Sequence, residues 1–470
     1  MKNLMRMGFA SALLLSITAC SSDNIVDSMQ ETSAEGAYLS LAIELPNATG
    51  NQRAIDESGD KNMGTEAEQK ISNLTVLVYD EQGGNAQTIS YNGNQLVPNA
   101  PNAIEPNKTT VYALPVFKVN SIGKKKVVVL VNPLNKKFEQ EATAKLDFMK
   151  TAQTWTKEEV AAISTENQFM MTNVNRSENS DGAVVVDVKA DNGKNNPAVI
   201  QVAVERVVAK IEDNSKSYEF VIKGGSGDTV TFTEVALING NTKFFPIMQV
   251  QNNKDGNGQN DYVVDPNFSN QSADTGKDFY ANSFTSFPTV DGTLVKSLST
   301  DMRACFYTLE NTMTASEQMN AYTTGLYYKA VYQLKDAAKG DNIYQYGGKL
   351  YTWNNFQKEA TANGVSLDNL TDDSSQEEFE KISVKKYVGG VCYYPYWIRH
   401  VGKVDGNMTP MEFAVVRNNY YQVNINSVKS IGDHKPITPN PTTPDELQES
   451  YLNITVKVMP WIVRKNNIDF

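Results

Sequence analysis

The sequence of 470 residues predicts a mainly β protein with two blocks of strands and an extended C-terminal strand. Runs of β-branched and apolar residues recur along the chain, and turn-rich segments separate them. Helical signals are few: Thr156 and Glu159 could form an N-terminal capping box, and residues 376–381 are a second candidate. The expected strands are residues 74–79, 126–131, 198–208, 218–222, 229–238, 327–334 and 420–428.

Two of these runs are apolar on both faces, which is typical of strands in the interior of a sheet. They are residues 74–79, Leu-Thr-Val-Leu-Val-Tyr, and residues 126–131, with four valines and a leucine. Between runs, the dipeptide Asn92-Gly93 predicts a hairpin-type turn, and residues 224–228 predict a Gly-rich loop.

The boundary between the two blocks is expected just after Val208, near residues 212–216. In the second block, residues 251–277 are rich in Asn, Asp and Gly and predict a long exposed insertion. Four oxygen-bearing side chains alternate there as in a calcium loop, but the closing bidentate Glu is missing, which favours a solvated loop. These four are Asp255, Asn257, Gln259 and Asp261.

The composition argues against an enzyme and against nucleic acid as a partner. Lys+Arg is 43 and Asp+Glu is 54, a net charge of -11, whereas phosphate binding needs a basic face. The two histidines, His400 and His434, nearly exclude His-built metal sites and make Ser-His-Asp chemistry hard to assemble. We therefore expect no enzymatic activity, no cofactor and no metal.

The sequence leaves some alternatives open. A glycosidase pair cannot be identified among so many carboxylates. Trp353 and Trp397 could form a sugar-stacking platform, as a surface glycan-binding lipoprotein would require, although buried aromatics are commoner in a β core. Cys305 and Cys392 could form one disulfide or remain two buried thiols.

The first twenty residues predict a lipoprotein signal peptide. Lys2 and Arg6 precede an apolar run over residues 9–17, which is too short to span a bilayer as a helix. The run ends in Ile-Thr-Ala-Cys, which resembles a bacterial lipobox with Cys20 as the lipidated residue. The polar residues 21–36 predict a flexible tether.

The two ends of the chain carry strands of matching pattern, in which four apolar residues alternate with polar or small ones and share one face. The N-terminal four are Leu39, Leu41, Ile43 and Leu45. The C-terminal four are Leu452, Ile454, Val456 and Val458, and Trp461 follows them. Both runs end near a proline, which cannot extend a ladder. The two strands could therefore occupy one groove in equivalent register.

Features next to each strand suggest how one could replace the other. Arg53 and Ala54 lie in a polar loop suited to a trypsin-like protease, and a cut there would release the first strand with the lipid anchor. The vacated sheet edges would be a template for another strand. Residues 435–444 hold four prolines and predict an extended spacer that keeps the last strand away from its own body, ready for a neighbour.

These observations accompany a resemblance to the FimA/Mfa fimbrillins of Bacteroidales, which build type V pili, and most closely to the short-fimbria (Mfa) type. The similar blocks span most of the chain, whereas residues 242–318 match poorly. The blocks are KISNLTVLVY (70–79), KKVVVLVN (125–132), FMMTN (169–173), VERVVAK (204–210), KYVGG (386–390), VRNNYY (416–421) and VKVMPW (456–461).

The resemblance implies two transthyretin-like β-sandwich domains and a C-terminal extended donor strand. It divides the chain into a signal peptide (1–20), a tether with a cleavable strand (21–53), two sandwiches (54–212 and 213–434) and a spacer with the donor strand (435–470). Arg417, Asn418 and Asn419 would then be structural residues at the start of a strand.

The resemblance also implies the function of a stalk subunit. The precursor would be an outer-membrane lipoprotein, cleaved after Arg53 by an Arg-specific or trypsin-like protease. Strand 38–46 would then be displaced, and the donor strand 451–470 of a neighbour would replace it. The expected partners are identical subunits head-to-tail and minor, anchor and tip subunits, in an extracellular fimbria that supports adhesion and biofilm formation.

Overall fold

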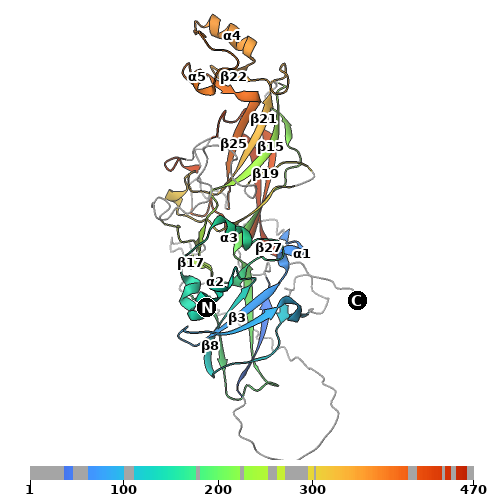
Figure 1. Cartoon of the computed structure of the whole chain (residues 1–470), viewed down its shortest axis with the longest axis vertical. Coiled ribbons are helices and arrows are strands. Elements are labelled where there is room, and N and C mark those ends of the chain that lie inside the picture. Colours follow the sequence, from blue (N-terminus) through green and yellow to red (C-terminus); the bar gives the residue numbers. More distant parts are fainter. Residues whose placement is uncertain are drawn as a thin grey trace, which may run out of the picture. The chain divides into compact units, whose positions relative to one another are not determined.

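The computed structural model describes residues 36–45, 62–99, 111–175, 180–222, 227–251, 262–269, 295–300, 303–400, 410–436, 440–445 and 451–462. These described residues all belong to one unit, drawn in Figure 1. Strands far outnumber helices among the described residues, so the prediction of a mainly β protein is confirmed. In the same residues, no helix has the length and apolar character needed to cross a membrane.

The first block of strands forms a ten-stranded sheet that encloses an apolar core of its own. Eight strands follow one another in the order β4-β3-β8-β10-β12-β1-β6-β5, while β11 pairs with β8 and β7 pairs with β1. Their bounds are β4 Gln87–Asn92, β3 Asn73–Tyr79, β8 Gly123–Val131, β10 Met171–Asn173, β12 Ala198–Arg206, β1 Tyr38–Glu44, β6 Val111–Ala113, β5 Val97–Asn99, β11 Val184–Val188 and β7 Phe117–Lys118.

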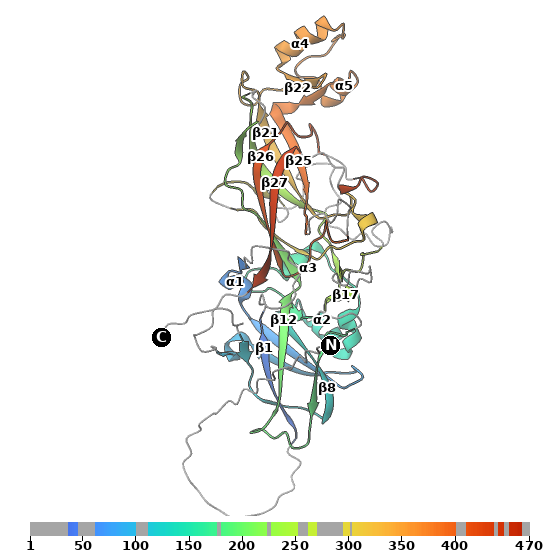
Figure 2. The same cartoon turned by 180° about the vertical axis from the view of Figure 1, so that it is seen from behind.

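The second block is a sandwich of two five-stranded sheets with a second core between them (Figure 2). One sheet has the order β2-β27-β26-β13-β20: Asn62–Met63, Leu452–Ile462, Asn419–Val428, Val208–Asp213 and Cys305–Leu309. The other has the order β14-β15-β21-β25, with β19 beside β15: Glu219–Val221, Thr229–Ile238, Gly325–Gln333, Val391–Trp397 and Val295–Ser297.

Three small sheets and the helices complete the described fold. The sheets are β16 Lys243–Phe244 with β9 Gln153–Thr154, β17 Gln249–Gln251 with β18 Tyr262–Val264, and β23 Lys349–Tyr351, β22 Ile343–Tyr346 and β24 Lys385–Tyr387. The α helices are α1 Glu66–Gln69, α2 Lys136–Ala144, α3 Lys157–Ala162, α4 Trp353–Ala362 and α5 Gln376–Glu380. Single 3-10 turns are η1 Gly93–Gln95, η2 Leu146–Lys150, η3 Ala315–Glu317 and η4 Val388–Gly390.

The predicted helices are confirmed. Thr156 caps α3 and forms a capping box with Glu159, and α5 has the same arrangement with Ser375 and Glu378. The central strands β3 and β8 are buried on both faces, as their apolar runs predict.

Two sequence-based expectations were wrong, and a third was wrong for the part of its segment that the structure describes. The run 198–208 is two strands, because the chain leaves β12 after Arg206 and joins the other block as β13 at Val208. Asn92-Gly93 starts η1, so β4 does not continue into a two-residue hairpin. In the insertion 251–277, Asp265 and Asn267 are buried, so this part is not exposed.

The remaining expectations about these segments stay predictions. The calcium-loop residues Asp255, Asn257, Gln259 and Asp261 lie outside the described residues. The domain boundary at residue 212 is also untested, although the change of sheets at Val207 lies five residues before it.

Candidate strand-exchange site

The strand β1 lies in the interior of the ten-stranded sheet, with partners on both edges. It pairs in parallel with β12 over six positions, from Leu39↔Ala198 to Glu44↔Ala203. Its other edge pairs antiparallel with β6 at three positions and with β7 at two. Removal of β1 would therefore leave a slot with two rows of unpaired backbone groups, the kind of edge that accepts another strand.

The four apolar residues predicted to share one face of β1 all point into the core. Leu39, Leu41, Ile43 and Leu45 are each at most 1% exposed. On the other face Ser40, Ala42 and Glu44 are half-buried, and Gln201 Nε2 donates a hydrogen bond to Glu44 Oε2 (2.7 Å). A core-filling strand of this kind contributes about 2 kcal/mol for each buried apolar side chain.

The walls of the slot explain why sequence reasoning found only part of it. Strand β12 was predicted, but β6 and β7 are three and two residues long and carry no periodic signal. Short backbone contacts extend them: Leu114 N donates to Leu41 O (2.9 Å) and Val119 N to Ala37 O (2.8 Å). Cys20, Arg53 and Ala54 lie outside the described residues.

The C-terminal strand β27 is not held away from its own body, which corrects the sequence-based expectation. It pairs antiparallel with β26 at nine positions, from Val428↔Leu452 to Asn419↔Pro460, with an irregularity between Ile425 and Ser427 (Figure 2). Its outer edge pairs with β2 only at Trp461 and Ile462. The open edge of β26 and the apolar face of its sheet explain why β27 pairs with the sheet of its own chain.

The four donor residues are less deeply buried in β27 than their counterparts are in β1. Leu452 and Val458 are buried, at 4% and 6% exposure, whereas Ile454 and Val456 are half-buried against the second core. The matching alternation is thus present in both strands, but the slot of β1 encloses all four positions.

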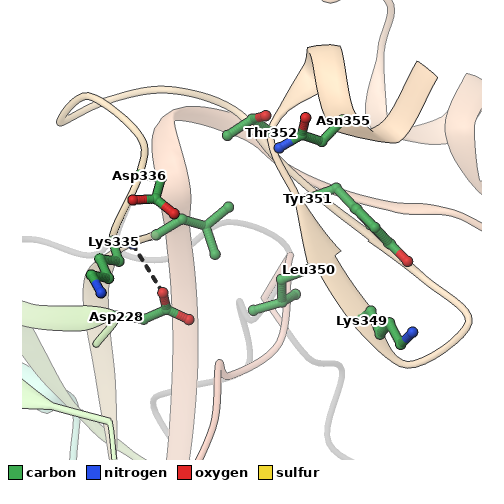
Figure 3. A pocket seen from close by; sticks show the side chains of 9 residues that line it. Asp228, Lys335, Asp336, Lys349, Leu350, Tyr351, Thr352 and Asn355 are labelled. Atoms are coloured by element: carbon green, nitrogen blue, oxygen red, sulfur yellow. Dashed lines mark hydrogen bonds between the residues drawn. The ribbon is translucent and has the colours of Figure 1, made fainter. Parts of the chain in front are cut away.

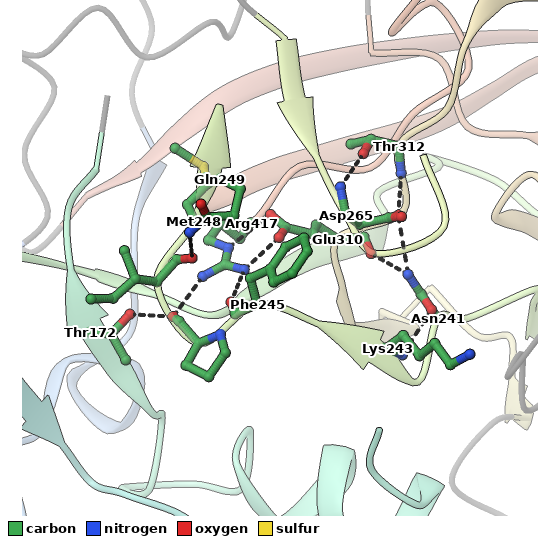
Figure 4. Close-up of polar contacts among 12 residues, drawn as sticks. Thr172, Asn241, Lys243, Phe245, Met248, Gln249, Asp265, Glu310, Thr312 and Arg417 are labelled. Carbon is green, nitrogen blue, oxygen red and sulfur yellow. Dashed lines mark hydrogen bonds and ion pairs between the residues drawn. The ribbon is translucent and has the colours of Figure 1, made fainter. Parts of the chain in front are cut away.

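Arg417, Asn418 and Asn419 have the structural role expected of them, directly before or at the start of β26. The Arg417 guanidinium is fully buried and forms an ion pair with Glu310, which is also fully buried (Figure 4). It donates further bonds to Phe245 O (2.6 Å) and Pro246 O (3.0 Å). Burial alone would lower the pKa of Arg417, but the charge of Glu310 raises it, so the guanidinium stays ionised.

The same network reaches the first block of strands. Thr172 of β10 donates to Pro246 O (2.7 Å), the carbonyl that Arg417 also contacts (Figure 4). Asp265 accepts bonds from Thr312 N (2.7 Å) and Asn267 N (2.6 Å). These contacts connect the two blocks and give Arg417 a structural explanation without a ligand.

The tryptophans do not form the platform that the glycan hypothesis needs. Trp397 is 3% exposed. Trp353 is half-buried and packs against Tyr344 (5.1 Å between centroids), Phe356 and Phe379 of a small aromatic core. An open pocket of about 430 Å³ lies nearby (Figure 3), lined by residues that include Asp336, Lys349 and Tyr351 but neither tryptophan.

Cys305 and Cys392 are both free thiols, so the disulfide alternative is wrong for this structure. Burial raises the pKa of Cys305 to about 11 and that of Cys392 to about 12, which keeps both protonated at neutral pH. Among the described residues, no group of His, Cys, Asp and Glu side chains is arranged to hold a metal ion.

The fold and the slot define a class of protein: a mainly β subunit whose first described strand is an interior strand of its sheet. The chain belongs to the major fimbrial subunit family. The model of the "Major fimbrial subunit protein (FimA)" matches residues 37–219, and that of the "Major fimbrial subunit protein type IV, Fimbrillin, C-terminal" matches residues 385–467. Together they span more than half of the chain. It is a structural subunit of a cell-surface fimbria, and this family is not a class of enzymes.

Several solved structures are similar to this chain. A proposed cell adhesion protein from Parabacteroides distasonis ATCC 8503 is 15% identical, with a TM-score of 0.50 over 93% of this chain and 100% of that one. A fimbrilin from Porphyromonas gingivalis W83 is 18% identical, with a TM-score of 0.43 over 92% of this chain and 100% of that one. The tip fimbrial protein Mfa3 from the same species is 12% identical, with a TM-score of 0.39 over 90% of this chain and 99% of that one. The search of curated proteins found no match.

Proposed function

We propose that this fimbrial subunit is a stalk subunit that polymerises by strand exchange. The observation that carries the proposal is the two-sided slot of β1, whose occupant is the first strand of the described fold. The precursor is exported as a lipoprotein through Cys20 and cleaved between Arg53 and Ala54. The freed segment then leaves the slot, and residues 451–470 of a second copy fill it in the register of β1.

Backbone pairing alone does not drive this exchange. β1 has six pairing positions on one edge and three plus two on the other, while β27 has nine on β26 and two on β2. The gain in free energy comes from Ile454 and Val456, which are half-buried beside β26 of their own subunit and would be fully buried in the slot. Burial of the exposed part contributes about 1 kcal/mol for each side chain.

So small a gain requires proteolysis as the committing step. In the uncut chain, β1 competes for the slot at the high effective concentration of a tethered strand. Cleavage turns β1 into a separate peptide that dilutes away once it dissociates. The uncut precursor is therefore expected to stay monomeric, and the cut subunit to assemble slowly.

The proposal also covers the partners and the location. The lipid on Cys20 would hold the precursor in the outer membrane until an Arg-specific or trypsin-like protease acts. The growing fimbria would contain identical subunits head-to-tail and end in minor, anchor or tip subunits. Exposed on the cell surface, it would support adhesion and biofilm formation.

Cleavage at Arg53 or at Lys61, the next basic residue in the sequence, tests the proposal. Purified precursor is treated with a trypsin-like protease and analysed by N-terminal sequencing and by unboiled gel electrophoresis. We expect an Ala54 N-terminus and a ladder of oligomers from the wild type and from Lys61→Ala. We expect only monomers from the double variant Arg53→Ala, Lys61→Ala, which has no basic residue between β1 and β2. Persistent monomers from wild-type protein with the Ala54 N-terminus and an intact C-terminus would overturn strand exchange.

A further inference from the structure

The spacer before the C-terminal strand is fastened to the second block rather than free. Asn320 N donates to Thr443 O (3.0 Å), and Asp445 N donates to Gln318 O (3.1 Å). Thr323 Oγ1 donates to Asp445 Oδ2 (2.5 Å). Three hydrogen bonds therefore fix the segment that ends at Asp445.

These contacts reach the interior of the protein. Asp445 is 4% exposed, and Gln318 is fully buried. Gln318 Oε1 in turn accepts a bond from Phe413 N (2.7 Å). A carboxylate in such surroundings is costly to leave unpaired, so the segment is not easily pulled out.

The beginning of the spacer is fastened as well. His434 Nε2 lies 2.6 Å from Glu380 Oε1, and Lys435 Nζ forms an ion pair with the same oxygen (2.7 Å). Gln376 Nε2 donates to His434 O (2.8 Å). Because both ends of the proline-rich stretch are held, its length does not contribute to the reach of the last strand.

We propose that Asp445 is the fixed root of the donor arm and that only the residues after it swing to a second copy of the chain. This inference rests on the proposed function. Seven residue steps separate Asp445 from Leu452. An extended chain covers about 3.5 Å in each step, so Leu452 lies within about 25 Å of its own Asp445.

The root also identifies the surfaces that meet in the fimbria. In the register of β1, Leu452 takes the place of Leu39, beside Ala198 of β12 and Phe117 of β7. That end of the slot must then lie within about 25 Å of the donor's Asp445. The reach sets a looser bound on the end near Leu45, because its occupant Val458 lies thirteen residue steps from Asp445, up to about 45 Å in an extended chain.

A compensation experiment separates a fixed root from a free tether. Deletion of residues 446–449 shortens the arm beyond the root, and insertion of Gly-Ser-Gly-Ser after Thr438 restores the total length before it. With a fixed root, the deletion lowers ladder formation about tenfold, since the reach falls to about 10 Å, and the insertion does not rescue it. A deletion without effect, or a rescue by the insertion, would overturn the fixed root.

A variant in which the contact of Asp445 with Thr323 is removed provides the matched comparison for the shortened arm. Thr323→Val with Asp445→Asn removes the charged contact, and in this background the insertion is expected to restore ladders to the shortened arm. Continued failure would contradict the role of this contact. The insertion alone should assemble like the wild type. If the cleaved wild type forms no ladder, strand exchange itself fails, which is a different result.

A distance measurement does not depend on the shortened variants. Spin labels are placed at Thr442→Cys in one batch of subunits and at Lys194→Cys or Asn94→Cys in another, all with Cys305→Ser. Lys194 lies two residues after Asn192, whose carbonyl oxygen accepts a hydrogen bond from Tyr38 N at the start of β1. Asn94 lies in η1, directly after β4. In mixed fimbriae, the 442–194 distance should be the shorter one; the reverse order would contradict the docking surface.

Discussion

At the scale of single residues, a buried ion pair fastens α1, which follows the proposed cleavage site in the sequence. Glu68 of α1 binds Lys210 Nζ (2.9 Å) and accepts a bond from Tyr307 OH (2.6 Å). Burial alone would raise the pKa of Glu68, but the charge of Lys210 and these hydrogen bonds hold it below its usual value. Burial would lower the pKa of Lys210, but nearby Cys305 and Glu68 raise it.

Replacement of Glu68 tests this pair. Glu68→Gln should destabilise the protein by about 2 kcal/mol at pH 7, because the charge of Lys210 loses its closest partner. The pKa of Glu68 is lower in the folded state, so the stability it supplies is present above the usual pKa of about 4.5 and is lost as the pH falls through the folded value. The advantage of the wild type should therefore shrink in acid.

Denaturant unfolding at pH 7 and below pH 4 measures this difference. The exposed Glu66→Gln in the same helix is the control and should change stability little at either pH. A Glu68→Gln variant as stable as the wild type at pH 7 would show that the pair does not stabilise the fold.

For Arg417 and Glu310, which are both fully buried, we expect a different effect of single and double substitutions on stability. Arg417→Met should cost about 3–5 kcal/mol, because it leaves Glu310 charged and without its cation. The double variant Arg417→Met, Glu310→Met should be more stable than the single variant. Thermal unfolding of the three proteins checks the order, and a double variant less stable than Arg417→Met would contradict the account.

At the scale of elements, the sequence predicted the strands that have a periodic pattern and missed those defined by their partners. The alternation of Leu39, Leu41, Ile43 and Leu45 was enough to predict a buried face. The short strands β6 and β7 exist because β1 offers them an edge, which no local pattern reveals. The location of β27 was also missed, because a proline-rich spacer does not show that tertiary contacts fasten it.

The slot should bind the donor strand as a separate peptide. A synthetic peptide of residues 451–470, added to cleaved subunits, should shorten the ladders, because it fills the slot without carrying another subunit. A peptide with Ile454→Asp and Val456→Asp is the control, since charges in the core would prevent binding. Gel densitometry measures the ladders, and equal inhibition by both peptides would argue against occupancy of the slot.

At the scale of the whole molecule, charge opposes assembly. Removal of residues 1–53 would take away Lys2, Arg6 and Arg53 but also five acidic residues, so the subunit would keep a net charge of -9. Subunits of like charge repel one another at long range, and the attraction must come from short-range burial and backbone pairing. Scarce histidine and cysteine fit a protein that functions by polymerisation.

This balance predicts how salt affects the fimbria. Ladder formation by cleaved subunits should be faster at 0.15 M than at 0.01 M salt, because the Debye length falls from about 30 Å to about 8 Å and the repulsion is screened. Finished ladders should persist in about 1 M salt, since apolar burial does not depend on attraction between charges. Time courses on unboiled gels measure both effects. Slower assembly or dissolution of ladders at high salt would instead show that opposite charges hold the subunits together.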